Sequence, residues 1–267
     1  MFQRLLAIGL LTLAWSPAAH AQVDIAPSGT LRAAYLATNP AQVSRNAQTG
    51  DLRGVSYDLA QRLAKATGKR LELQALPSPP AVVDAVAKGE ADIGFVAYET
   101  TRLGTVEFSQ TYMLVQQTFL VLDASTIRSA KDIDRAGQKI AGTKSDSMML
   151  CLKRILKRAL PVELDNNPEL IGKAITSGAI DALGASRQRL TALARNIPGT
   201  RLLPDTLFNV PQNIIVPKGK TEVLAFVDAF IDAQRASGLL GTSVANGGAV
   251  GVEAAPRSPG NQHGCPE

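Results

Sequence analysis

The sequence has little of the chemistry on which most enzyme active sites depend. It contains two histidines, two cysteines and one tryptophan, and only 4% of its residues are aromatic. His20 and Trp15 lie near the N-terminus, and His263 lies in a Gly- and Pro-rich C-terminal stretch. The sequence therefore excludes Ser-His-Asp and Cys-His catalysis and metal sites built on His or Cys. We expect no metal, no cofactor and no catalytic residues, although carboxylate chemistry stays open.

The N-terminus has the three parts of an export signal. Residues 1–4 are positively charged, residues 5–15 are apolar, and Ala19-His20-Ala21 matches a cleavage site. The apolar run is too short to cross a membrane, which takes roughly 20 residues. Position 22 is Gln rather than the Cys that a lipid anchor needs. We expect a signal peptide over 1–21, cleaved after Ala21, and an exported soluble chain.

The net charge of +5 does not indicate a nucleic-acid partner. The densest basic cluster, residues 153–158, alternates with the apolar residues Leu152, Ile155 and Leu156. This spacing is typical of the polar face of an amphipathic helix. No aromatic residues alternate with the cluster, as a groove that stacks bases requires. We expect no nucleic-acid binding.

Strand-like and helix-like segments alternate along the chain. The strands are expected at 31–35, 71–75, 93–97, 139–142 and 162–164, and the helices at 54–66, 82–88, 147–160, 168–177 and 221–237. Such alternation predicts mostly parallel sheets flanked by helices. The fold class is therefore α/β.

An internal sequence repeat indicates that this α/β unit occurs twice. AVAKGEADIGF (85–95) resembles AITSGAIDALG (174–184), and each places a helix-ending Gly three residues before an Asp that opens a buried strand. The equivalent residues Asp92 and Asp181 are expected to fix the turn between helix and strand. The repeat predicts two similar lobes.

Two apolar extended segments, 118–122 and 213–218, are expected to cross between the lobes as a hinge. The boundaries that follow are 22–117 plus 212–240 for lobe 1 and 118–211 for lobe 2. From about residue 245 the composition turns to Gly, Ala and Pro. We therefore expect a flexible C-terminal tail over 241–267. A ligand held between two such lobes would close them around the hinge.

The segment 89–112 is the most specific part of the sequence. It combines a helix stop, a buried strand, Arg102 and the sequence Val-Glu-Phe-Ser-x-x-Tyr. This pattern resembles the signature of family 3 periplasmic solute-binding proteins, the receptors of polar amino acid ABC importers. The guanidinium of an arginine presents a planar fork of donors that suits a carboxylate. The alternative is a surface ion pair of Arg102 with Glu99 or Glu107.

The resemblance implies a type II periplasmic-binding-protein fold, with two lobes of mixed sheet joined by a two-segment hinge. It also implies a monomeric periplasmic receptor that passes a small carboxylate-bearing solute to a permease in the inner membrane. The candidate ligand-binding residues that it implies are Arg102, Tyr98, Ala97, Asn39, Ser145, Asp146, Ser147 and Ser186.

Two of these positions depart from the family pattern. Ser186 stands where relatives carry an acidic residue for the α-ammonium of the ligand, and a neutral Ser does not offset the desolvation of a buried ammonium. This favours a keto acid or another small carboxylate without an α-amino group. Asp146 lies at a helix N-terminus that otherwise suits an anion. The alternative for Asp146 or Ser147 is that either residue only caps the helix.

Two other functions fit the same scaffold. One is a periplasmic accessory or sensory protein that is not coupled to transport. The other is an enzyme similar to cyclohexadienyl dehydratases, for which Asp146 is the obvious candidate carboxylate.

The two cysteines leave two alternatives open. Cys151 and Cys265 form a disulfide in an oxidising compartment, which requires the C-terminus to reach the helix around residue 151. Otherwise, Cys151 is a small buried residue and Cys265 a free thiol.

Overall fold

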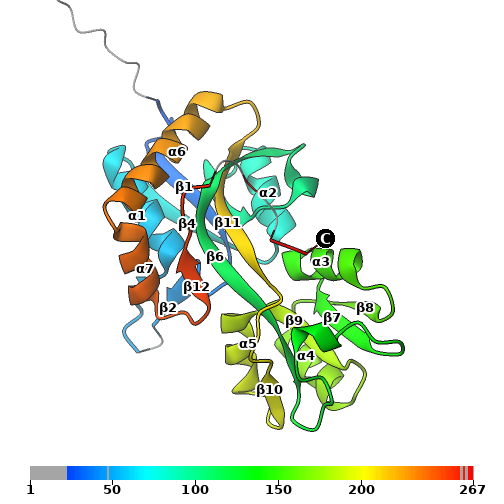
Figure 1. Ribbon diagram of the computed structural model, residues 1–267. Coiled ribbons are helices and arrows are strands. Elements are labelled where there is room, and N and C mark those ends of the chain that lie inside the picture. Colours follow the sequence, from blue (N-terminus) through cyan, green and yellow to red (C-terminus); the bar gives the residue numbers. More distant parts are fainter. Residues whose placement is uncertain (1–22, 47, 259–260, 262–263, 267) are drawn as a thin grey trace, which may run out of the picture.

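One continuous mixed sheet extends through two lobes of the chain (Figure 1). The computed structural model describes residues 23–46, 48–258, 261 and 264–266, so the expected signal peptide and His263 lie outside the described residues. The strands of the large sheet are β1 (Thr30–Leu36), β4 (Arg70–Leu76), β5 (Ile93–Ala97), β6 (Val106–Leu122), β7 (Lys139–Thr143), β8 (Leu160–Leu164), β9 (Ala182–Ser186), β10 (Thr200–Leu202), β11 (Phe208–Pro217) and β12 (Val252–Ala254). Their order is β4-β1-β5-β11-β6-β9-β7-β8, and β10 and β12 pair with β6. A separate hairpin consists of β2 (Ser44–Arg45) and β3 (Leu52–Arg53).

Helices cover both faces of the sheet. They are α1 (Val55–Ala66), α2 (Pro79–Ala87), α3 (Ser147–Ile155), α4 (Pro168–Thr176), α5 (Arg187–Ala194), α6 (Thr221–Ala236) and α7 (Leu239–Gly247), with short 3₁₀ turns at Thr100–Arg102 and Ala130–Asp132. In lobe 1, which contains β1 to β5, the helices are α1, α2, α6 and α7. In lobe 2, which contains β7 to β10, they are α3, α4 and α5. No helix in the described ranges is both long and apolar enough to span a membrane.

Each lobe buries its own core, as the repeated α/β pattern predicts. In lobe 1, Leu59 and Leu63 of α1 pack with Ile93 of β5. In lobe 2, Met148 of α3 packs with Ile140 of β7. The strands β1–β4, β1–β5, β7–β8 and β7–β9 pair in parallel. The expected two-lobe α/β architecture is confirmed.

The strands β6 and β11 form the hinge. They pair antiparallel from Val106–Pro217 in lobe 1 to Gln117–Phe208 at lobe 2 (Figure 1). On either side of this pair, β11 pairs with β5 of lobe 1 and β6 pairs with β9 of lobe 2. The two crossings expected from the sequence are therefore neighbouring strands of one sheet.

The two equivalent aspartates fix equivalent turns. The Oδ2 atom of Asp92 accepts a hydrogen bond of 2.8 Å from the amide of Arg32 in β1. The Oδ2 atom of Asp181 accepts one of 2.7 Å from the amide of Lys139 in β7. Each carboxylate thus ties the turn before one strand to its parallel neighbour, which is the structural role expected for both residues.

The helix expected over 147–160 ends earlier, at Ile155. The carboxylate of Asp134 accepts hydrogen bonds from the amides of residues 157–159, and Leu160 begins β8. Because these amides bond to Asp134 rather than to carbonyls of the preceding helical turn, the helix ends within the basic cluster 153–158.

The C-terminal region differs from the flexible tail expected over 241–267. Residues 239–247 form α7, and β12 pairs with β6, with Val252 opposite Val115. Gly248 and Gly251 have positive φ angles of 60° and 74°, which glycine adopts at little cost. The Gly-rich composition that indicated a loose tail therefore provides the turns that return the chain to the sheet.

Candidate functional site

Two adjoining cavities lie between the lobes, next to the hinge. The smaller has a volume of about 40 Å³ and the larger about 270 Å³. The larger is close to the lower limit of roughly 300 Å³ for small-molecule sites. Both are lined by Leu36, Thr38, Pro79, Asp146 and Arg189. Because the cavities share these walls, we treat them as one cleft.

Five of the eight candidate residues line the cleft. Ala97, Asn39, Asp146 and Ser186 line the smaller cavity, and Ser145 lines the larger with Asp146. Asn39 also has a local role, since its Oδ1 atom accepts a hydrogen bond of 3.1 Å from the amide of Ala41. The cleft therefore brings together residues from lobe 1 and lobe 2 that lie far apart in the sequence.

Two candidates lie away from the cleft. Tyr98 is buried in the core of lobe 1, where its ring meets that of Phe108 edge-on at a centroid distance of 5.1 Å. Successive side chains at a strand end point to opposite sides, so Ala97 faces the cleft and Tyr98 does not. Ser147 is the buried first residue of α3 and lines neither cavity.

Arg102 connects the two lobes through backbone carbonyls. Its Nη1 atom donates to the Ala97 carbonyl at 2.6 Å, and its Nη2 atom donates to the Ser145 carbonyl of lobe 2 at 3.2 Å. The side chain lines a third cavity of about 240 Å³, which shares Pro80 and Ser145 with the larger cavity of the cleft. Burial lowers the pKa of Arg102, and the nearby carboxylates of Glu99 and Asp146 oppose this effect.

The loop before α3 has a strained conformation. Ser145 has a φ of +62°, in the left-handed region, and is the one non-glycine residue with positive φ in the described ranges. The next residue, Asp146, is the N-cap of α3, and its Oδ1 atom accepts a hydrogen bond of 2.7 Å from the Ser147 amide. Asp146 therefore caps the helix and also lines the cleft.

Arg189 is the cleft residue that the sequence reasoning missed. It lies in the first turn of α5, a helix that was not expected, three residues after Ser186. Its Nη1 atom donates to Thr143 Oγ1 at 2.9 Å, and its Nη2 atom donates to Asn166 Oδ1 at 2.6 Å. Its position at the carboxyl end of a buried strand was the available signal, because ligands of α/β sheets bind there.

The charge of Arg189 is only loosely paired. Its Nη1 atom lies 3.9 Å from Asp146 Oδ2, beyond hydrogen-bond distance. Burial lowers the pKa of Arg189, and the Asp146 carboxylate opposes that shift. An arginine remains protonated in proteins in spite of such a shift. The cleft thus contains a largely buried cation whose direct hydrogen-bond partners are neutral.

Amide side chains line the hinge side of the smaller cavity. The Nε2 atom of Gln42 donates to Gln212 Oε1 at 3.0 Å and to the Phe95 carbonyl at 3.2 Å. The Oε1 atom of Gln42 accepts a hydrogen bond of 2.9 Å from the Leu36 amide. These bonds hold the amides between lobe 1 and the hinge strand β11.

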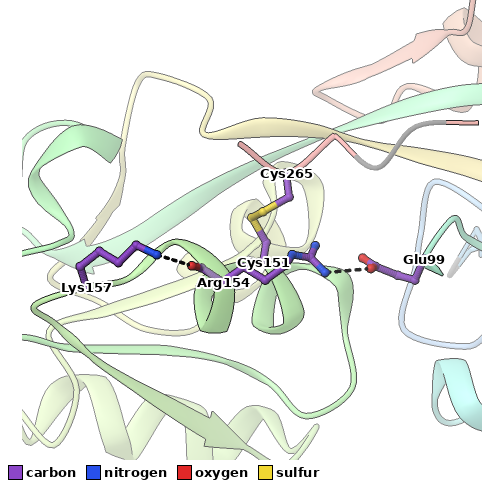
Figure 2. Close-up of a disulfide and its surroundings, with 5 residues drawn as sticks. All are labelled: Glu99, Cys151, Arg154, Lys157 and Cys265. Atoms are coloured by element: carbon purple, nitrogen blue, oxygen red, sulfur yellow. Dashed lines mark hydrogen bonds and ion pairs between the residues drawn. A yellow bond between two sulfur atoms is a disulfide. The ribbon is translucent and has the colours of Figure 1, made fainter. Parts of the chain in front are cut away.

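Two further contacts close the seam between the lobes. Asn166 Nδ2 donates to Thr38 Oγ1 at 3.2 Å. Glu99, only 2% exposed, forms an ion pair of 3.4 Å with Arg154 of α3 (Figure 2). In this structure, the lobes therefore touch on both sides of the cleft.

No group of three or more His, Cys, Asp or Glu residues with the geometry of a metal site occurs in the part of the chain that the structure describes.

Two solved structures with the same architecture are described as amino acid-binding or amino acid transporter substrate-binding proteins. An amino acid ABC transporter substrate-binding protein of Streptococcus pneumoniae, bound to L-arginine, matches with a TM-score of 0.69 at 23% identity, over 82% of this chain and 94% of that one. An ancestral amino acid-binding protein, described as a precursor of cyclohexadienyl dehydratase, matches with a TM-score of 0.67 at 24% identity, over 82% and 95%. At these identities, the likeness shows the fold alone.

Sequence relatives and a family model agree with the fold. The glutamine-binding protein of Geobacillus stearothermophilus is 27% identical over 175 residues, which cover 64% of this chain and 66% of that protein, just under two thirds of its length. The ABC transporter glutamine-binding protein of Bacillus subtilis (strain 168) is 23% identical over 199 residues, 73% of this chain and 72% of that protein. The model of the bacterial extracellular solute-binding proteins, family 3, matches residues 31–245. The chain belongs to this family.

Proposed function

We propose that the protein captures a small carboxylate-bearing solute, an amino acid or a related organic acid, between its lobes and delivers it to the permease of an ABC importer. The observation that carries this proposal is the cleft, which is lined from both lobes and the hinge and contains the largely buried cation Arg189. A buried guanidinium favours an anionic ligand. The two glutamine-binding relatives support a solute of this class.

Export belongs to the same proposal. The mature protein would begin at Gln22 and act as a monomer in the periplasm. A periplasmic accessory or sensory protein would use the same cleft and differ only in its partner.

A dehydratase activity is less well supported. It requires a carboxylate that is free to transfer a proton, and Asp146 is the candidate in the cleft. One of its oxygens caps α3 and the other faces Arg189. Both contacts restrain the position of the carboxylate, so we favour binding over catalysis.

Ligand binding is expected to draw the lobes together. A solute that contacts both lobes stabilises the closed arrangement and shifts the population towards it. Small-angle X-ray scattering of the mature protein, with and without saturating solute, should show a smaller radius of gyration when the solute is bound. An unchanged radius at saturation would contradict the two-lobe clamp.

Loss of the Arg102 side chain is expected to weaken the closed form. Arg102→Ala leaves the carbonyls of Ala97 and Ser145 without this donor, which costs about 1–3 kcal/mol. Arg102→Lys should recover part of this loss, because an ammonium provides charge without the planar fork. Whether Arg102 also contacts the solute stays a prediction.

The measurement for Arg102 is calorimetric titration with L-glutamine, L-arginine and pyruvate. Arg62→Ala, which removes an exposed arginine of α1, is the control and should bind like the unmodified protein. Equal affinity of the Arg102→Ala and Arg62→Ala variants would show that Arg102 does not hold the lobes together.

A further inference from the structure

We propose that Arg189, rather than Arg102, binds the carboxylate of the solute, and that Asp146 beside it accepts a hydrogen bond from the substituent on the solute's α-carbon. This inference rests on the proposed function and narrows its ligand. The class that it specifies is a small carboxylic acid with a hydrogen-bond donor, an ammonium or a hydroxyl, on the carbon next to the carboxylate.

Arg189 has donors to spare. A guanidinium carries five N–H groups, and the side-chain bonds of Arg189 in the described structure go to Thr143 and Asn166, from one η nitrogen each. Both partners are neutral, and the carboxylate of Asp146 is 3.9 Å away. The side chain is 13% exposed, so water supplies little compensation. A carboxylate in the cleft would satisfy the remaining donors with charge-assisted bonds.

Arg102 is less available for this role. Each η nitrogen of Arg102 makes one hydrogen bond, as in Arg189, but these bonds join the Ala97 carbonyl of lobe 1 to the Ser145 carbonyl of lobe 2 and so hold Arg102 in a contact between the lobes. Arg102 lines a cavity that shares only Pro80 and Ser145 with the larger cavity of the cleft, whereas Arg189 lines both cavities of the cleft. A solute in the cleft would therefore meet the guanidinium of Arg189 first.

Asp146 restricts which carboxylates fit. A carboxylate bound to Arg189 lies close to that of Asp146, and two like charges at this distance repel. A donor on the α-carbon removes the conflict, because it can bond to Asp146 Oδ2, the oxygen that does not cap α3. The carbonyl of a keto acid would instead face Asp146 with another acceptor. Asp146 thus supplies the acidic group that Ser186 lacks, from the loop that follows the neighbouring parallel strand β7.

Two matched ligand sets test this inference on the mature protein by calorimetry. The first is L-alanine, L-lactate and pyruvate, and the second is L-glutamine with its 2-hydroxy and 2-oxo analogues. In the set that fits the cleft, the amino and hydroxy acids should bind more tightly than the oxo acid. Arg189→Gln should weaken both by about 30-fold or more, the lower end of the effect of unpairing a buried charge. Asp146→Asn should weaken the amino acid more than the hydroxy acid.

The control variant is Arg195→Gln, which removes an exposed charge just after α5 and should bind like the unmodified protein. Tight binding that Arg189→Gln leaves unchanged would overturn the inference while the proposed function stands. Preference for the oxo acid would also overturn it and restore the expectation drawn from Ser186. Failure of the unmodified protein to bind either set would overturn both proposals.

The disulfide carries a second, independent inference. Cys151 of α3 and Cys265 are bonded, with a Cα–Cα distance of 5.6 Å across 114 residues of sequence (Figure 2). The sequence had left this pairing open. Cys265 is only 5% exposed and packs in the core of lobe 2 with Phe208. The bond therefore joins the segment that follows β12, after it has left lobe 1, to helix α3 of lobe 2.

The described residues of this terminus follow the hinge. After β12, the amide of Ala255 donates to the Tyr112 carbonyl in lobe 1. Asn261 accepts a bond of 2.7 Å from Asn213 Nδ2 of β11. Gly264 lies so close to the carbonyl of Asn209 that a Cβ atom would come within 1.7 Å of its oxygen.

We infer that this terminus is a covalent strap that limits how far the lobes open. It adds a third connection beside the two hinge strands. It also holds α3, whose N-terminus bears Asp146 and whose Arg154 pairs with Glu99 across the seam (Figure 2). Reduction of the bond would free the terminus and allow a wider opening.

Amide hydrogen exchange on the unliganded protein tests the strap. In the double variant Cys151→Ser/Cys265→Ser, exchange should quicken at the seam, in residues 99–105 and 145–150, relative to strands β1 and β7. Chemical reduction of the unmodified protein should have the same effect. Unchanged exchange at the seam, or an equal increase in β1 and β7, would show that the bond only stabilises the fold.

Discussion

Backbone pairing between β6 and β11 is the constraint on which the rest of the structure depends. The pair extends from Val106 and Pro217 in lobe 1 to Gln117 and Phe208 at lobe 2, so both lobes share one hydrogen-bonded sheet. Its register also places Gln212 beside Gln42 at the hinge side of the cleft. The lobes can therefore move apart only about these two paired strands, beside which the cleft lies.

Electrostatics within the cleft decide what it can hold. Buried charges are stable only with partners, and two acid–base pairs lie near the seam: Glu99 of lobe 1 with Arg154 of lobe 2, and Asp146 near Arg189 within lobe 2. The first pair joins the lobes directly. The second is looser and lines the cavities, which leaves a largely buried cation and a carboxylate oxygen for a solute. Selectivity would follow from the closeness of these two groups rather than from either one alone.

Patterns with a strong period were predictable from the sequence, and contacts between distant segments were not. The repeated Gly-x-x-Asp turn identified the structural roles of Asp92 and Asp181, because both the residue and its position recur. Tyr98 was expected at the cleft, whereas its ring packs against Phe108 in the core of lobe 1, because neighbouring residues at a strand end point to opposite sides. Helix α5 begins with polar residues and has no marked apolar stripe, so Arg189 went unnoticed. The C-terminal segment was predicted to be flexible because a Gly-rich composition does not distinguish a loose tail from the tight turns that return the chain to β6.

The most direct test of the account is the identity of what the protein carries. Protein purified without added ligand should release a small molecule on denaturation, and mass spectrometry would identify it. The account predicts a carboxylic acid with an amino or hydroxyl group on the α-carbon, present in the unmodified protein and lost in Arg189→Gln. A solute without a carboxylate, or a carboxylic acid retained equally by both proteins, would contradict it.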